Sequence, residues 1–279
     1  GEGTVHLANT SANTYTGGTS VNYGTLKLDA ATTNLTPATG TITVTTSGIF
    51  DINGYSVSSP ISLGGGTVVS STGSGGAITG GITLTSVSYL GASAGAVLTI
   101  NTTPITITTN SPIFGTSAYT GTVVLDTSLT SPVNTWVRAA YGILKLGNAT
   151  ALNAATSFVV DANGTLDIAG YSFAKDFSLA GIVLSSTGNT GALTGAVTLT
   201  ASTATLAASS GAVLTVGAAS RISGSYLLNV GTSNYTGTVV YANSGVHTYT
   251  LGTTVAYGTL KLGVSTDVFP TAGTVTINS

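Results

Sequence analysis

Short alternations of apolar and polar residues recur along the whole chain, and most of them follow a glycine. Examples are Gly24–Leu28 (GTLKL), Gly40–Val44 (GTITV), Gly81–Leu84 (GITL) and Ala96–Ile100 (AVLTI). Alternation with a period of two is typical of β-strands, in which successive side chains point to opposite faces. Clusters of turn residues, such as Ser71–Gly76, separate these runs. The pattern therefore predicts an all-β chain of many short strands.

One segment of 26 residues occurs three times, beginning at Gly3, Gly121 and Gly237, and each copy ends in Tyr-Gly-x-Leu-Lys-Leu. The starts lie 118 and 116 residues apart and define internal repeats 3–120, 121–236 and 237–279, the last of them partial. Alternation in the shared strand places its leucines on the inward face. The leucines predicted to be buried are Leu26, Leu28, Leu144, Leu146, Leu260 and Leu262.

A repeat of this length suits several turns of a parallel β-helix better than other all-β folds. A propeller blade takes about 40–50 residues, and a sandwich needs no internal repeat. At roughly 20–24 residues per turn a repeat makes five or six turns, and at about 4.8 Å per turn the chain makes a rod on the order of 60 Å long. We therefore predict that residues 1–279 form a single continuous β-solenoid. Both chain ends fall inside a repeat, so we expect a processed chain or a piece of a longer polypeptide.

Composition narrows the class of protein. Only 14 of 279 residues are charged, the formal net charge is -2, and cysteine is absent. Abundant β-branched residues and low charge disfavour disorder. The charge provides no basic surface for nucleic acid, and no run of about 18 apolar residues exists to cross a membrane. Without cysteine, disulfides give no argument for secretion.

Candidate catalytic motifs are weak. Gly91–Gly95 (GASAG) matches the G-x-S-x-G pattern, but it lies between strand-like runs, whereas a nucleophile elbow needs a strand-to-helix turn. His6 and His247 are the only histidines, and neither recurs in the other copies. Single imidazoles of this kind are more often surface or half-buried residues than bases or ligands. Zinc sites need clustered cysteine and histidine. We therefore predict no catalytic residue, no metal site and no cofactor.

The carboxylates give one further candidate site. Asp161–Asp167 (DANGTLD) has the form of half a calcium loop, but the first repeat lacks an acid at the position of Asp161. An aspartate that caps turn amides is the favoured interpretation. Polysaccharide lyases and glycosidases also use β-helices, and they need paired carboxylates or Asp with a basic residue. The nearest such set is Asp161, Asp167, Lys175 and Asp176, of which only Asp167 recurs, as Asp51. We predict that the protein is not an enzyme, with a lyase or glycosidase as a remote alternative.

Three segments of the first repeat together resemble a known family: Asn13–Leu28 (NTYTGGTSVNYGTLKL), Pro37–Val44 (PATGTITV) and Asp51–Gly54 (DING). They are similar to the passenger-associated repeat of bacterial autotransporter proteins. Thr253–Leu260 and Gly164–Ile168 match the same pattern in the other repeats. The resemblance implies a right-handed parallel β-helix that is exported to the cell surface or beyond.

The shared strand also presents tyrosine and lysine on its outward face. We predict that these side chains form one repeated stripe, made of Tyr23, Lys27, Tyr141, Lys145, Tyr257 and Lys261. One interpretation is a solvated edge whose lysines block unwanted strand pairing. The other is a contact stripe for a neighbouring rod or a glycan, because tyrosine offers a large area and a polar tip.

The ends of a β-helix expose unpaired backbone groups, which natural solenoids normally cover with a cap. Both ends of this chain read as ordinary repeat sequence, so we expect the strand ladder to be continued either by the rest of a longer chain or by an identical subunit stacked head to tail. The predicted end-stacking residues are Gly3, Thr4, Val5, Val275, Thr276 and Ile277. We therefore predict an extracellular structural protein, a rod or filament subunit at the bacterial cell surface that self-associates, since low charge gives little repulsion. The alternative is an adhesin passenger domain that binds a glycan or matrix.

Overall fold

The computed structural model describes residues 2–8, 13, 15–29, 40–73, 75–101, 104–108, 111–131, 135–243, 245–264, 269–270 and 273–278. These residues form thirty β-strands and no helix. The named strands pair in parallel throughout, and they stack as a β-solenoid of about 22 residues per turn. The predicted all-β parallel solenoid is confirmed.

The chain divides into two compact units, Gly1–Thr156 and Ser157–Ser279. The boundary falls inside the second repeat, 121–236, so the structural units do not coincide with the sequence repeats. That the whole chain is one continuous solenoid stays a prediction.

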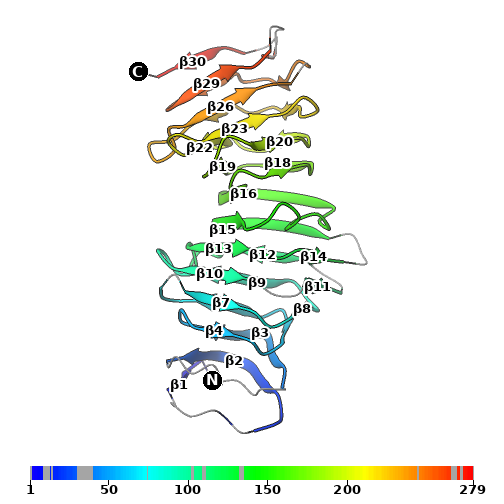
Figure 1. Ribbon diagram of the computed structural model, residues 1–279, viewed down its shortest axis with the longest axis vertical. Helices are drawn as coiled ribbons and strands as arrows, with labels where there is room; N and C mark the ends of the chain where they lie inside the picture. The colour runs from blue at the N-terminus through cyan, green and yellow to red at the C-terminus, as the bar shows by residue number, and fades with distance from the viewer. Residues whose placement is uncertain are drawn as a thin grey trace. The chain divides into compact units, whose positions relative to one another are not determined.

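Unit 1 is three-sided, and its chain visits three faces, here named A, B and C, in that order (Figure 1). Face A contains β5 (Ile61–Gly64), β8 (Ile82–Leu84), β11 (Ile105–Ile107) and β14 (Leu129–Thr130). Face B contains β1 (Thr4–Leu7), β6 (Thr67–Ser70), β9 (Ser88–Ala92) and β12 (Pro112–Phe114). Face C contains β4 (Ser56–Val57), β7 (Gly76–Ile78), β10 (Val97–Ile100) and β13 (Thr122–Leu125). Three long strands bend from one face to the next: β2 (Thr19–Leu28) and β3 (Ile42–Asp51) from A to B, and β15 (Trp136–Leu146) from B to C.

Unit 2 is built in the same way on faces D, E and F. Face D contains β18 (Phe177–Leu179), β21 (Val197–Leu199), β24 (Ile222–Gly224) and β27 (Thr248–Tyr249). Face E contains β19 (Ile182–Ser185), β22 (Thr205–Ala208), β25 (Leu228–Val230), β28 (Thr253–Val255) and β30 (Val275–Ile277). Face F contains β17 (Ser172–Phe173), β20 (Gly191–Leu193), β23 (Val213–Val216), β26 (Thr238–Tyr241) and β29 (Thr259–Leu262). β16 (Ser157–Asp167) bends from D to E.

Stacked aliphatic side chains fill the interior because the parallel register places equivalent residues over one another. On face A, Ile42 lies beside Ile61, and Ile61 lies beside Ile82; all three are buried. Full burial of such a side chain contributes about 1.5–3 kcal/mol. In unit 2, Phe158, Phe173 and Phe177 pack edge to face, with ring centroids 5.5–6.4 Å apart.

The sequence repeat and the solenoid turn do not have the same period. On face B, the pairs that begin at Leu26 continue through Phe50, Val68, Leu90, Phe114 and Ala139. These five turns take the chain from residue 26 to residue 139, whereas the repeat advances it to residue 144. The extra residues pass the corner at Gly142, so Leu144 lies on face C beside Val123. One repeat of unit 1 is thus five turns plus the passage to the next face.

The predicted inward leucines lie at inward positions, but their burial differs. Leu28, Leu144 and Leu146 are buried, whereas Leu26 and Leu260 are partly exposed. Leu262 is 47% exposed, so its predicted burial is wrong, although its neighbour in register, Tyr241, is fully buried. The reason is that β29 is the outermost described strand of face F, and no described strand covers it.

Candidate functional site at the terminal strands

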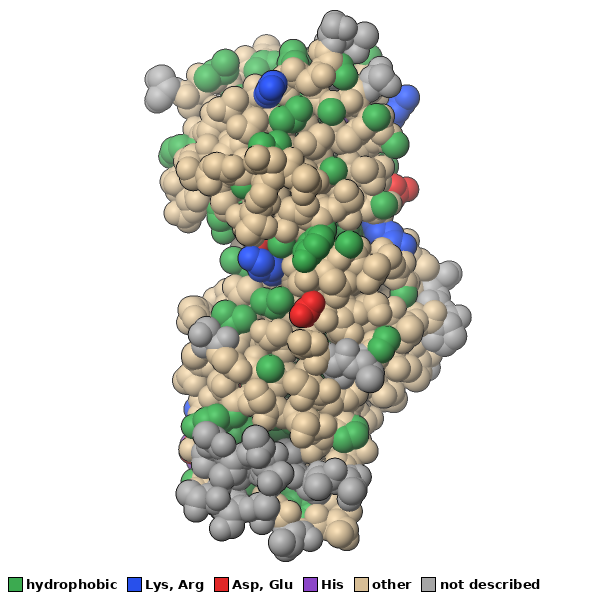
Figure 2. Space-filling model, in the orientation of Figure 1, with side chains coloured by type: hydrophobic (Ala, Val, Ile, Leu, Met, Phe, Trp, Pro, Cys, Tyr) green, Lys and Arg blue, Asp and Glu red, His purple; other side chains and the backbone are tan. Residues whose placement is uncertain are grey.

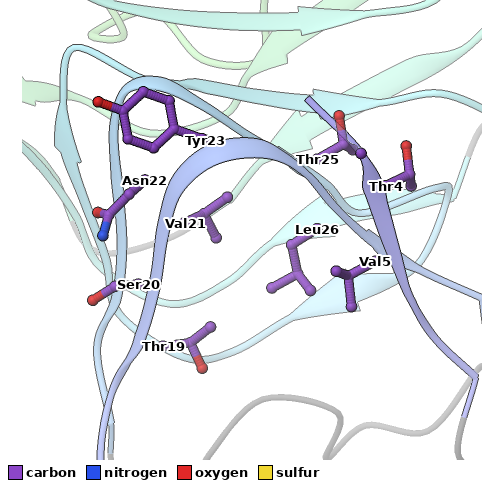
Figure 3. A pocket seen from close by; sticks show the side chains of 10 residues that line it. Thr4, Val5, Thr19, Ser20, Val21, Asn22, Tyr23, Thr25 and Leu26 are labelled. Carbon is purple, nitrogen blue, oxygen red and sulfur yellow. The ribbon is translucent and has the colours of Figure 1, made fainter. Parts of the chain in front are cut away.

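The strands at the N-terminal end of unit 1 enclose an open pocket of about 390 Å³ between β1 and β2. Its lining residues are Gly3, Thr4, Val5, Thr19, Ser20, Val21, Asn22, Tyr23, Thr25 and Leu26. Val5, Val21 and Leu26 extend from the two strands toward the same side, whereas Tyr23 lies at the far end of the group (Figure 3). Val5 and Leu26 are neighbours in register on face B. The pocket is therefore the apolar interior of the solenoid, at an end where no described strand lies beyond β1.

The exposure of β1 contrasts with that of the same strand in the other repeats. Val5 is 61% exposed, whereas its counterparts Val123 and Val239 are 2% and 0% exposed. Val123 lies between Leu98 and Leu144, so strands cover it on both sides. Val5 has Leu26 on one side and no described strand on the other. Val5 of the terminal strand thus points inward, as its counterparts in internal strands do, but no described strand covers it.

The C-terminal end of unit 2 shows the same contrast. Ile277 of β30 is 75% exposed, whereas its repeat counterparts Val44 and Val160 are fully buried. β30 pairs with β28 on face E, and β29 pairs with β26 on face F (Figure 1). Among the described residues, neither strand has a partner on its second side. Leu262 and Ile277 therefore occupy core positions on strands that no further described strand covers.

The structure places the predicted end-stacking residues at these ends. Thr4 and Val5 lie in β1, with Gly3 just before it, and Val275, Thr276 and Ile277 form β30. Sequence reasoning missed Thr19, Val21 and Leu26 of the pocket and the exposed Leu262. The signal that could have identified these residues is their position in the first and last copies of the repeat, because a strand in a terminal turn can lack a neighbouring strand.

The tyrosine and lysine side chains do not form one stripe in unit 1, which corrects the prediction. Lys27 lies on face B, and its Nζ is 3.8 Å from Oδ2 of Asp51. Lys145 lies on face C beside Val124. Tyr23 is 71% exposed, whereas Tyr141 is only partly exposed. The separation follows from the difference between the repeat and the turn.

In unit 2 the corresponding repeated strand is β29 of face F. Lys261 lies in this strand, Tyr257 lies just before it, and both side chains are exposed. A contact role for any of these six residues stays a prediction.

Asp51 and Asp167 stabilise equivalent corners. Oδ1 of Asp51 accepts hydrogen bonds from the backbone amides of Asn53 (2.8 Å) and Ser71 (3.0 Å). Oδ1 of Asp167 accepts the equivalent bonds from Ala169 (2.9 Å) and Ser186 (3.0 Å). Each carboxylate therefore closes a turn and joins it to the next turn of the solenoid. The capping interpretation is confirmed for Asp167, and the described residues contain no group of three or more metal-ligating side chains.

His247 is buried in unit 2. Its Nδ1 accepts a hydrogen bond from the backbone amide of Ile222 (3.0 Å), and its ring packs edge-on against Tyr241, with centroids 4.7 Å apart. Burial, with a smaller contribution from the charge of Arg221, lowers the pKa of His247 to about 4. The imidazole is therefore neutral near pH 7 and lies in the core. His6, in contrast, is exposed and pairs with Asp29.

The GASAG segment has no nucleophile-elbow geometry. Gly91 and Ala92 end β9, and a turn leads from Ser93 back into β10 without a helix. Gly91 packs against Tyr119, which leaves no room for a Cβ atom at residue 91.

Comparison with protein-family models, with curated proteins and with solved structures finds no match for this chain. The described residues contain no helix that is long and apolar enough to cross a membrane. The family resemblance therefore stays a prediction.

Proposed function

We propose that this protein is an extracellular structural subunit that assembles into a filament by head-to-tail stacking of its terminal strands. The observation that carries the proposal is the exposure of Val5, Leu262 and Ile277, whose counterparts in the other repeats are buried. Exposed strand edges with apolar side chains are templates for pairing with another chain.

The energetics favour association. Each aliphatic side chain contributes about 1.5–3 kcal/mol when it is fully buried. Burial of several such side chains, together with new backbone hydrogen bonds, contributes a free energy comparable with the roughly 4–15 kcal/mol that association costs in lost translational and rotational freedom. The surface shown in Figure 2 carries few charged side chains, so electrostatic repulsion between copies is small.

The two ends are different surfaces, so their contact is heterologous. A heterologous contact that does not close into a ring produces an open filament. This favours a filament subunit over a discrete oligomer. The extracellular location is supported by the sequence resemblance alone.

The tyrosine and lysine positions do not distinguish the filament from the adhesin alternative. A single stripe would have served a neighbouring rod as well as a glycan, and Lys27 and Lys145 lie on different faces of unit 1. Stable monomers at every concentration would nevertheless favour an adhesin.

The test measures assembly of the purified chain against concentration, by sedimentation velocity and electron microscopy. Val5→Glu should block the N-terminal end, and Ile277→Glu should block the C-terminal end. Each variant alone should stay monomeric, and an equimolar mixture should stop at dimers, because one functional end remains on each variant. Thr99→Glu, outward on face C, is the matched control and should still form filaments. A wild-type chain that stays monomeric up to high concentration would overturn the proposal.

A further inference from the structure

We infer that the joint between two copies has a fixed register: β1 of one copy pairs with β29 of the other, and the first half of β2 pairs with β30. This inference rests on the proposed function, and it specifies which strands and residues meet.

The order of the faces determines which strands meet. In unit 2 the chain passes from face E to face F, and in unit 1 it passes from face A to face B. β30 lies on face E and β29 on face F. β2 begins on face A, and β1 lies on face B. If face A continues face E, then face B continues face F, and both pairs of exposed strands meet in one joint.

This arrangement also continues the path of the chain. After β30 on face E, the next face in order is F, where no described strand lies beyond β29. β1 of the second copy takes that position. Its chain then returns to the first half of β2, which takes the position beyond β30. The joint thus imitates one more turn of the solenoid, and both strand pairs stay parallel, as in each unit.

The register follows from the alternation of inward and outward residues. Within a unit, Val239 pairs with Leu260 and Tyr241 with Leu262, so these leucines point inward. A one-residue slip would turn every inward side chain outward, so the apolar parity excludes odd shifts. A two-residue slip would leave half of β1 without a partner on β29, because both strands are four residues long. The inward pairs at the joint are then Val5 with Leu260, Leu7 with Leu262, Thr19 with Val275 and Val21 with Ile277.

The pocket between β1 and β2 receives the apolar side chain of β30. Val21 is buried at its wall, and Ile277 is the most exposed of the large apolar side chains among the described residues. In the proposed register Ile277 lies under Val21 and fills the open interior. On the outside, Ser20 lies beside Thr276, Thr4 beside Thr259, and His6, which pairs with Asp29 within its own copy, beside Lys261.

The test uses cysteine cross-linking. Because the chain contains no cysteine, any disulfide must join the introduced residues. Ser20→Cys and Thr276→Cys are made in separate chains and mixed at equal concentration under mild oxidation. Neighbouring residues on paired strands lie about 4.8 Å apart, which is within the range of about 4.4–6.8 Å that a disulfide allows. We expect a disulfide-linked dimer that carries one copy of each variant. Each variant alone should give at least tenfold less dimer, because head-to-tail joints do not bring two copies of one residue together.

The control for register replaces Ser20→Cys with Asn22→Cys, two residues further along β2. Its dimer yield with Thr276→Cys should fall at least tenfold, since the atoms are then too far apart for a disulfide. A higher yield for the shifted pair, in a sample that still forms filaments, overturns the register but leaves the proposed function. No assembly and no cross-link in either mixture overturns both.

Discussion

Leu26 and Leu144 occupy the same position in the repeated sequence, yet Leu26 stacks on Phe50 of face B and Leu144 stacks on Val123 of face C. The difference arises because five turns use fewer residues than one repeat. Any side chain that recurs once per repeat therefore moves to the next face in unit 1. Features that must form a continuous stripe along the solenoid would need the period of the turn, not that of the repeat.

The corner carboxylate is the first target for mutation. Asp51→Ala removes an acceptor from the backbone amides of Asn53 and Ser71, in a buried site. Loss of such charge-assisted bonds should lower the free energy of unfolding by about 2–4 kcal/mol. Thermal unfolding followed by circular dichroism measures the change. Glu2→Gln, at an exposed position, is the control and should change stability by less than about 0.5 kcal/mol.

Ala169 offers a stabilising mutation. Its φ is 49°, which is unfavourable for alanine, and Asn53 has the same φ at the equivalent corner. Ala169→Asn should raise the free energy of unfolding by about 0.5–1.5 kcal/mol, because asparagine tolerates this conformation and can bond locally. The converse change, Asn53→Ala, should be destabilising, since it removes the 2.8 Å bond from Nδ2 to the carbonyl of Leu28. A lower melting temperature for Ala169→Asn would contradict this explanation.

Gly115 and Gly231 should tolerate no side chain. A Cβ atom at Gly115 would lie 1.9 Å from the carbonyl oxygen of Tyr141, and one at Gly231 would lie 2.0 Å from that of Tyr257. Both glycines also have positive φ, 76° and 74°. We expect each Gly→Ala change to cost about 3 kcal/mol or more, from steric overlap and backbone strain together.

Gly73 provides the control for this pair, because its φ is 67° but no atom lies within 4 Å of the added Cβ. Gly73→Ala should cost only about 1–2 kcal/mol, from the backbone alone. Equal losses for Gly73→Ala and Gly115→Ala, measured by urea unfolding, would show that packing at Tyr141 contributes nothing.

His247 should make unit 2 sensitive to acid. Its pKa is lowered to about 4, mainly by burial, so the unfolded chain binds a proton more tightly than the folded one. Its contribution to stability is complete above about pH 6.5 and is lost as the pH falls towards 4, up to about 3 kcal/mol. Protonation would also disrupt the bond that Nδ1 accepts from Ile222. Unfolding measured between pH 7 and 4 should show this loss in the wild type.

His247→Asn is the matched variant, because the first repeat has Asn13 at this position. It should be less stable than the wild type at pH 7 and should lose less stability on acidification to pH 4. The same pH dependence in both proteins would show that His247 is not responsible.

The sequence alone determined the type of secondary structure, the parallel solenoid and the inward side of each shared strand. These properties depend on local alternation and on the spacing of turns, and both can be read directly from the amino-acid sequence. The alternation of Leu26, Lys27 and Leu28 fixes which side chains point inward, whatever lies above or below. The capping role of Asp167 could also be predicted, because an aspartate before a tight turn bonds to nearby amides.

The tertiary structure decided which face each copy occupies and which inward side chains are covered. The face depends on the number of residues in every turn between two copies, and Leu26 reaches Ala139, not Leu144, because the five turns together use fewer residues than one repeat. Coverage depends on a neighbouring strand about 20 residues away, so Val5 is exposed while Val123 is buried. The two valines have the same local sequence pattern, and only the stacking of turns distinguishes the end of a solenoid from its middle.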